Sequence, residues 1–238
     1  PEEINRIVTD VIADHLFVTE QSGVDNLTNE GVDKNKIHFV GNVMIDSLVK
    51  LLPQINQSSI LQSLNIRPEE YILVTFHRPS NVDKYEILQP LIEFLSNQIT
   101  NDMHLIWPIH PRTQNQLKEF GLWEALINNE KIILLHPVGY HEMLKLNMQA
   151  RIILTDSGGL QEESCVLGTP CLTLRWNTER PITLRENGGA SVLVGNNVER
   201  IREEYKETLK LKRNPQIPEF WDGQTAMRCV KSIISFKE

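Results

Sequence analysis

The segment Thr155–Glu163 (TDSGGLQEE) combines residue types that suit a phosphate group. It follows the apolar run Ile152–Leu154, which is a predicted strand, and we expect a helix to begin within it. Gly158 and Gly159 would let the backbone approach a ligand closely, and free amides at a helix N-terminus favour an anion. Ser157 adds a hydroxyl donor. The sequence therefore indicates a phosphate site.

The same segment also permits a purely structural interpretation, which stays open. Asp156 and Ser157 could simply cap the helix, and Gly158 and Gly159 could form a tight turn. If a nucleotide binds here, Glu163 lies about one turn beyond Gly159, where a carboxylate could accept hydrogen bonds from ribose hydroxyls. The pattern is not GxGxxG, so it does not predict a dinucleotide site.

A histidine and an arginine, His77 and Arg78, follow the predicted strand Tyr71–Phe76. Arginine offers a bidentate fork to an anion, and histidine can donate or exchange a proton near neutral pH. The alternative is a surface loop with solvated charges. The place of the pair at the carboxyl end of a strand favours the functional interpretation.

Two more predicted strands end in histidines, His110 in PIHPR and His136 in HPVGY. Each could also be a packed structural residue. The carboxylates and cysteines of a metal site do not accompany them, so we predict no metal. Arg180 in TERP could close over a diphosphate, or it could instead form a salt bridge with Glu179.

Strand-length apolar runs alternate with amphipathic segments along the chain, which predicts a parallel, doubly wound α/β sheet of the Rossmann-like kind. In such sheets ligands bind beyond the carboxyl ends of the strands, where the residues above lie. The expected strands are His15–Val18, Ile37–Val40, Tyr71–Phe76, His104–Ile109, Ile132–Leu135, Ile152–Thr155, Cys171–Leu174 and Ser191–Val194. The expected helices include Tyr85–Ser96, His141–Gln149, Gly159–Leu167, Val198–Leu211 and Gly223–Phe236, with a loop over Lys212–Trp221.

Composition narrows the classes of function. The net charge of -7 comes without a basic stripe interleaved with aromatics, so a nucleic-acid partner is not expected. Apolar runs are far shorter than the roughly 20 residues of a membrane span, so no membrane partner is expected either. Three cysteines without metal-ligand spacing and the lack of a signal-like segment make the cytoplasm the expected location.

Taken together, the motifs resemble the non-hydrolysing UDP-N-acetylglucosamine 2-epimerases, and the resemblance runs from Pro1 through essentially the whole chain. TDSGGLQEE with TERP at this spacing, behind an HRP loop, is far more specific than any single motif. The matching segments, in family order, are PEEINR (1–6), GNVMIDSL (41–48), HRPSNVD (77–83), PIHPRT (108–113), TDSGGLQEES (155–164), GTP (168–170), TERPI (178–182) and DGQTA (222–226).

The resemblance implies the carboxyl-terminal part of a glycosyltransferase-B type fold, in a chain that lacks the family's amino-terminal domain. It implies connecting helices over 1–40, a UDP-binding domain over 41–222 and a closing helix over 223–238. The implied reaction inverts C2 of UDP-GlcNAc by elimination and re-addition of UDP, with a UDP-sugar as ligand, no cofactor, and a homodimer in the full-length protein. The chain alone is expected to bind UDP without turnover.

Residue roles carry over by motif. Glu2 and His77 match catalytic positions, and the matches to substrate-binding positions are Arg78, His110, Val138, Met143, Ser157, Gly158, Gly159, Glu163 and Arg180. Many family members have HRRE where this chain has HRPS (77–80), so a 2,3-diacetamido-glucuronate nucleotide is an alternative substrate. The sequence is also compatible with a non-catalytic nucleotide-sugar binding module and with a UDP-sugar glycosyltransferase.

Overall fold

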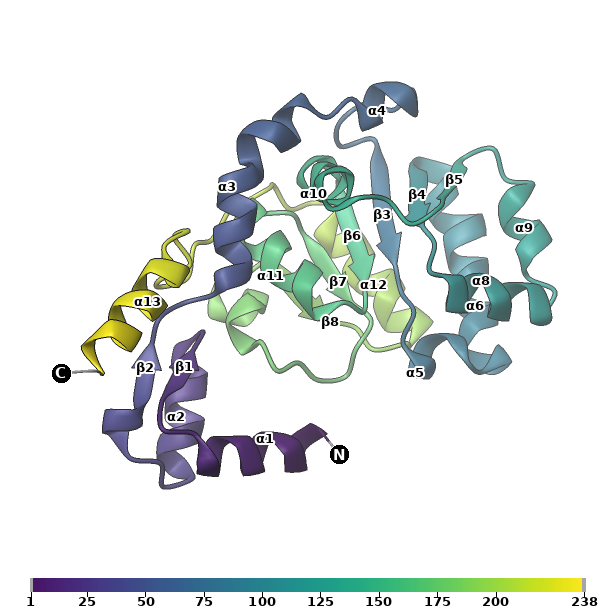
Figure 1. Cartoon of the computed structure of the whole chain (residues 1–238). Helices are drawn as coiled ribbons and strands as arrows, with labels where there is room; N and C mark the ends of the chain where they lie inside the picture. The colour runs from purple at the N-terminus through teal and green to yellow at the C-terminus, as the bar shows by residue number, and fades with distance from the viewer. Residues whose placement is uncertain (1, 237–238) are drawn as a thin grey trace. The chain divides into compact units, whose positions relative to one another are not determined.

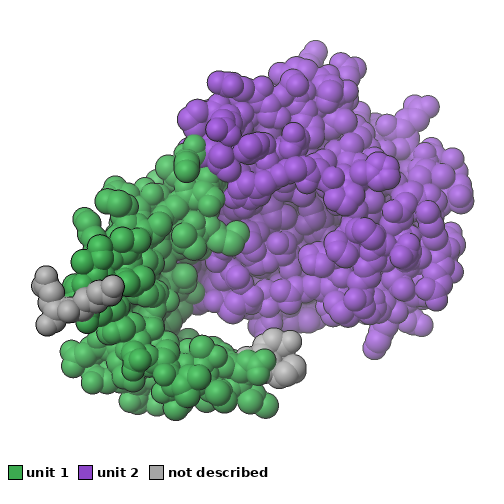
Figure 2. All heavy atoms as spheres, viewed as in Figure 1, with its two compact units in different colours: residues 1–50, 217–238 green, residues 51–216 purple. Residues whose placement is uncertain are grey.

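The structure is a computed structural model that describes residues 2–236, without the side chain of Glu2. The chain divides into two compact units, residues 1–50 with 217–238 and residues 51–216, which Figure 2 colours separately. The sequence predicts domain boundaries after residues 40 and 222, and that assignment stays a prediction. The candidate residues of the predicted site, Glu2 excepted, belong to the second unit.

The second unit contains a six-stranded sheet in which each neighbouring pair of strands is parallel (Figure 1). This confirms the predicted doubly wound α/β fold. The strand order is β5-β4-β3-β6-β7-β8. The strands are β3 (Tyr71–Thr75), β4 (His104–Pro108), β5 (Ile132–Leu135), β6 (Ile152–Thr155), β7 (Cys171–Thr173) and β8 (Ser191–Leu193).

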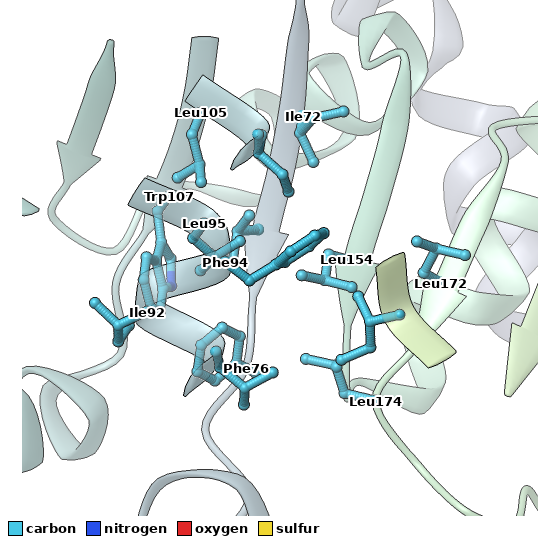
Figure 3. Close-up of a cluster of buried hydrophobic side chains, with 14 of the residues drawn as sticks. Ile72, Phe76, Ile92, Phe94, Leu95, Leu105, Trp107, Leu154, Leu172 and Leu174 are labelled. Carbon is cyan, nitrogen blue, oxygen red and sulfur yellow. The ribbon is translucent and has the colours of Figure 1, made fainter. Parts of the chain in front are cut away.

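Both faces of this sheet are buried, which explains the unbroken apolar runs. Successive side chains of a strand point to opposite faces. In β3, Ile72 and Val74 join the core cluster on one face, whereas Tyr71 and Leu73 join the cluster on the other. Figure 3 shows part of the first cluster, in which the ring centroids of Phe76 and Trp107 lie 4.6 Å apart.

The helices of this unit follow the strands as the sequence predicts, with small shifts at their ends. They are α4 (Ile60–Ser63), α5 (Pro79–Val82), α6 (Tyr85–Phe94), α7 (Thr100–Asp102), α8 (Pro111–Glu119), α9 (Trp123–Ile127), α10 (Tyr140–Gln149), α11 (Gly158–Leu167) and α12 (Val198–Thr208). The helix predicted over Tyr85–Ser96 is α-helical only to Phe94 and continues as a π-helical turn over Leu95–Ile99. The loop predicted over Lys212–Trp221 contains neither helix nor strand.

The strand order places the centre of the sheet between β3 and β6. From β3 the chain moves outward through β4 to β5, returns to β6 beside β3, and then moves to the opposite edge through β7 and β8 (Figure 1). The loops that leave β3 and β6 therefore diverge to opposite sides. Such a topological switch point forms a crevice, and it is the usual ligand site of open α/β sheets.

The first unit contains a parallel pair of short strands, β1 (Leu16–Val18) and β2 (Ile37–Phe39), with the small core formed around Leu16, Val18 and Leu27. Its helices are α1 (Glu2–Ile12), α2 (Gln21–Asn29), the beginning of α3 (Val43–Gln57), and α13 (Thr225–Ser235). None of the helices within residues 2–236 is both long and apolar enough to cross a bilayer.

Asp46 fixes the start of α13 within this unit. Its carboxylate accepts hydrogen bonds from the backbone amides of Thr225 at 3.0 Å and Ala226 at 2.7 Å. Trp221 is buried just before this helix and donates from Nε1 to the carbonyl of Thr19 at 2.9 Å. The closing helix predicted from the sequence is thus present and begins two residues later than expected.

Candidate functional site

Asp156 joins the two loops that leave the centre of the sheet. It is the first residue after β6 and is fully buried. Its Oδ2 accepts hydrogen bonds from the backbone amides of His77 at 2.9 Å and Arg78 at 2.8 Å, and from Nδ2 of Asn81 at 2.9 Å. The His77–Arg78 loop after β3 is therefore held against the loop after β6.

His77 is placed by the same carboxylate. Its Nδ1 lies 3.3 Å from Oδ1 of Asp156, while 44% of its side chain remains exposed. The imidazole stacks on that of His110, with ring centroids 5.1 Å apart. His110 caps α8, and its Nδ1 accepts from the backbone amide of Arg112 at 3.1 Å, so neutral His110 carries its proton on Nε2.

Arg78 is half-buried beside His77. Its Nε donates to the backbone carbonyl of Asp156 at 2.9 Å. Within the described part of the chain, neither terminal nitrogen of this guanidinium has a hydrogen-bond partner. Arg78 can therefore present a free pair of donors to an anion.

Helix α11 begins with glycines at the switch point. Ser157 is its N-cap, and Oγ accepts from the backbone amide of Leu160 at 3.5 Å. Gly158 and Gly159 are the first two helical residues rather than a tight turn. The cap interpretation is thus confirmed for Ser157 and wrong for Asp156, whose carboxylate is engaged by the loop after β3. Amides of a first helical turn carry positive partial charge toward any nearby anion.

Arg180 lies directly over this first turn. A Cβ built on Gly158 would be 2.5 Å from Nη1 of Arg180, so only glycine allows the guanidinium to come so close. Nε of Arg180 donates to Oε1 of Glu162 at 2.7 Å, and Nη1 pairs with Glu179, which confirms the predicted salt bridge. Burial by itself would lower the pKa of Arg180, but the two carboxylates raise it. A permanent cation therefore stands beside the helix N-terminus.

Glu163 is a buried carboxyl group one turn further along α11, with 4% of its surface exposed. Burial raises the pKa of Glu163 to about 7. The hydroxyl of Tyr140 opposes this rise, and Glu162 makes a smaller contribution that adds to it. Burial also raises the pKa of Tyr140. Glu163 can therefore change its charge near neutral pH.

The structure gathers the predicted residues into three groups within the second unit. His77, Arg78 and His110 form one group, and Ser157, Gly158, Gly159 and Arg180 form another; Glu163 stands with Tyr140. Val138 lies in the loop just before α10 and Met143 lies in the first turn of this helix, and both are partly buried against the second core cluster. His136 is exposed after the edge strand β5. The side chain of Glu2, in α1, lies outside the described residues. The binding and catalytic roles of all these residues stay proposals.

Sequence reasoning missed four residues that organise these groups: Asp156, Asn81, Glu162 and Tyr140. Their partners are distant in sequence, and no local pattern identifies them. Only Asp156 carries a signal in the sequence, because a carboxylate directly after a fully buried strand must find donors on a neighbouring loop. Among residues 3–236, no group of three metal-binding side chains comes together.

Comparison with known proteins gives consistent matches. A family model described as UDP-N-acetylglucosamine 2-epimerase matches residues 1–234. A UDP-N-acetylglucosamine 2-epimerase of Methanocaldococcus jannaschii is 42% identical over 237 residues, which are 98% of this chain and 64% of that protein. A UDP-2,3-diacetamido-2,3-dideoxy-D-glucuronate 2-epimerase of Pseudomonas aeruginosa is 38% identical over 199 residues, covering 82% of this chain and 52% of that protein.

A solved structure extends the match to three dimensions. The crystal structure of the Methanocaldococcus jannaschii UDP-GlcNAc 2-epimerase in complex with UDP-GlcNAc and UDP superimposes with a TM-score of 0.87 at 42% identity. The match covers 99% of this chain and 65% of that one. The chain thus spans less than two thirds of the length of these relatives.

Proposed function

The chain belongs to the UDP-N-acetylglucosamine 2-epimerase family, and from this membership we propose that it is the UDP-binding part of an enzyme that interconverts UDP-GlcNAc and UDP-ManNAc. One observation carries the proposal beyond family membership. The guanidinium of Arg180 lies over Gly158, at the start of α11 and at the topological switch point of the sheet. A cation and the free amides of a helix N-terminus, placed at a topological switch point, together suit a diphosphate.

The proposed complex places the diphosphate between Arg180 and the amides of Gly158 and Gly159, with the hydroxyl of Ser157 as a further donor. The ribose hydroxyls donate to the carboxylate of Glu163, one turn along the same helix. The remaining base end of the nucleotide lies beside Val138 and Met143, at the start of the neighbouring helix α10.

The proposed reaction proceeds through elimination. A base removes the proton from C2 of the sugar, the C2–H electron pair forms the C1=C2 bond, and the C1–O bond breaks to release UDP. UDP then adds back to C1 while C2 receives a proton on the opposite face, which inverts that carbon. Arg180 and Arg78 stabilise the departing diphosphate, whose charge grows as the bond breaks.

Glu2 and His77 are the proposed acid–base residues of this chain. A carboxylate suits removal of a weakly acidic C2 proton, and histidine can carry a proton to or from the reacting groups near neutral pH. The relatives extend beyond the length of this chain, so we propose that the 238 residues bind UDP but do not turn over the sugar. A homodimer and a cytoplasmic location stay proposals for the complete protein.

Calorimetric titration of UDP into the 238-residue chain tests the site. We expect binding that Arg180→Ala weakens by about 10- to 100-fold, since a charge-assisted hydrogen bond contributes about 1.5–3 kcal/mol. Arg200→Ala is the matched control. Arg200 is exposed on α12, so this substitution removes the same charge at a position away from the site. No UDP binding by the folded chain would refute the proposed site.

Turnover is tested with a longer protein, in which this chain is joined to the remaining third of the length of its relatives. Incubation with UDP-GlcNAc in heavy water should place deuterium at C2 of both epimers. Release of free sugar or transfer to an acceptor would refute the epimerase assignment. Turnover of the 2,3-diacetamido-glucuronate nucleotide in place of UDP-GlcNAc would move this chain to the branch of the Pseudomonas relative.

A further inference from the structure

We propose that Asp156 is a positioning residue that holds the imidazole of His77 in the Nδ1–H tautomer, so that Nε2 is the ring nitrogen left to interact with the substrate. The contacts of one buried carboxylate support this inference. The tautomer stands on geometry alone, whereas its use in catalysis rests on the proposed function.

The two oxygens of Asp156 have different surroundings. Oδ2 accepts three hydrogen bonds, from the amides of His77 and Arg78 and from Nδ2 of Asn81, all between 2.8 and 2.9 Å. Oδ1 is also buried and accepts no hydrogen bond from the described residues, and Nδ1 of His77 lies 3.3 Å from it, at ion-pair distance. Each oxygen therefore faces His77 or its backbone.

A buried carboxylate oxygen without a donor is destabilising, because it has lost its hydration and gained no hydrogen bond in return. Nδ1 of His77 can relieve this destabilisation only if it carries a hydrogen. An unprotonated Nδ1 would instead direct its lone pair at the negative oxygen. The electrostatics of the pair therefore select the Nδ1–H form of neutral His77.

The neighbouring imidazole, that of His110, is the opposite tautomer. His110 accepts a hydrogen bond at Nδ1 from the amide of Arg112, so its proton lies on Nε2. The two stacked histidines thus differ in tautomer: His77 presents an unprotonated Nε2 when neutral, and His110 presents an Nε2–H. Together they offer one acceptor and one donor at the carboxyl ends of β3 and β4.

Asp156 keeps the loop itself in place as well, so its effect on the tautomer must be separated from its effect on the fold. Asp156→Asn does this. The amide oxygen can take over the three hydrogen bonds at Oδ2, which leaves the amide nitrogen facing Nδ1 of His77. Because that nitrogen is a donor, Nδ1 must become an acceptor and the proton must move to Nε2. The equivalent Asp-to-Asn change in serine proteases leaves the geometry intact and produces the wrong histidine tautomer.

The test is nitrogen NMR of the 238-residue chain labelled with ¹⁵N-histidine at about pH 9, where histidine side chains are ordinarily neutral. The chain has seven histidines, and a His77→Gln variant identifies the pair of ring signals that belongs to His77. We expect Nδ1 of His77 to show the shift of a protonated nitrogen in the parent chain. In Asp156→Asn we expect the shifts of Nδ1 and Nε2 to exchange.

Two controls accompany this measurement. His110 should keep its Nε2–H tautomer in both proteins, because its partner is a backbone amide. Asp83→Asn removes a carboxylate that pairs with Arg112 nearby, and it should leave the His77 signals unchanged.

An Nε2–H tautomer for His77 in the parent chain would overturn the proposal, and this measurement requires no Asp156 variant, since His77→Gln serves only to assign the signals. An Asp156→Asn protein that folds with an unchanged His77 pattern would overturn it too. UDP titration of the same samples keeps the proposed function separate: absent UDP binding with the expected tautomers would refute the UDP site and leave the role of Asp156 standing.

Discussion

Replacing Gly158 with alanine tests whether Arg180 and the first turn of α11 act on one anion. The new Cβ would lie 2.5 Å from Nη1 of Arg180 and 2.8 Å from its Cζ, closer than carbon atoms can pack. The guanidinium must therefore move away from the helix start, and the 2.7 Å hydrogen bond from its Nε to Glu162 must lengthen or break. The atoms that move are the end of a flexible side chain, so the fold should tolerate the change.

The expected magnitude follows from the interaction that is lost. A hydrogen bond to a charged group contributes about 1.5–3 kcal/mol, and about 1.4 kcal/mol corresponds to a tenfold change in Kd. Displacement of Arg180 that forfeits about half of its contact should weaken UDP binding about three- to tenfold. Alanine is a better helix former than glycine by up to about 1 kcal/mol, so stability should stay equal or rise slightly.

A double-mutant cycle isolates the contact from other effects of the added methyl group. UDP is titrated calorimetrically into the parent, Gly158→Ala, Arg180→Ala and the double variant, with thermal unfolding of each protein recorded in parallel. We expect Gly158→Ala to cost almost nothing once Arg180 is already alanine. If Gly158→Ala weakens binding equally in both backgrounds, the methyl group acts on the ligand or the backbone directly, and the role assigned to Arg180 is refuted.

Three further predictions concern buried or capping carboxylates. Because the pKa of Glu163 is raised to about 7 and ribose hydroxyls donate to its ionised form, UDP binding should tighten as the pH rises from about 6 to about 8, and titrations of Glu163→Gln should lose this dependence. The free energy of unfolding should depend on pH in the opposite direction. Folding raises the pKa of Glu163, so the stabilising contribution of the neutral acid is full below the pKa of the unfolded chain and is lost as the pH rises through about 7. Above that pH, Glu163→Gln should melt at a higher temperature than the parent. An equal or lower melting temperature would contradict the assignment. Asp46→Ala removes both acceptors at the start of α13 and should lower the free energy of unfolding by about 1 kcal/mol in denaturant titrations. Asp46→Asn keeps only one acceptor oxygen for the two amides and should also be less stable than the parent.

The sequence by itself determined the fold class and which candidate residues follow the ends of the strands. Several strands of the large sheet are short, unbroken apolar runs, and burial on both faces makes that pattern recognisable without any knowledge of neighbouring segments. Ligand-binding residues follow strand ends by the geometry of parallel sheets, so His77, Arg78, Ser157 and Gly158 could be chosen from position and residue type. The family motifs added their expected roles.

The ends of helices were harder to predict from the local sequence. The predicted helix over Tyr85–Ser96 changes to a π-helical turn at Leu95, and Val198–Thr208 ends three residues before the predicted end. These differences arise where the ends of helices pack against other elements, and hydrophobic periodicity does not record that packing.

Only the tertiary structure decided which of the strand-end loops meet. The order β5-β4-β3-β6-β7-β8 brings β3 beside β6, and this adjacency is what places Asp156 against the backbone of His77, 79 positions away in the chain. The same holds for Arg180 over Gly158 and for Tyr140 beside Glu163. A local pattern records whether a residue is buried and how its own segment folds. The partner that satisfies a buried charge comes from another segment, and strand order alone selects that segment.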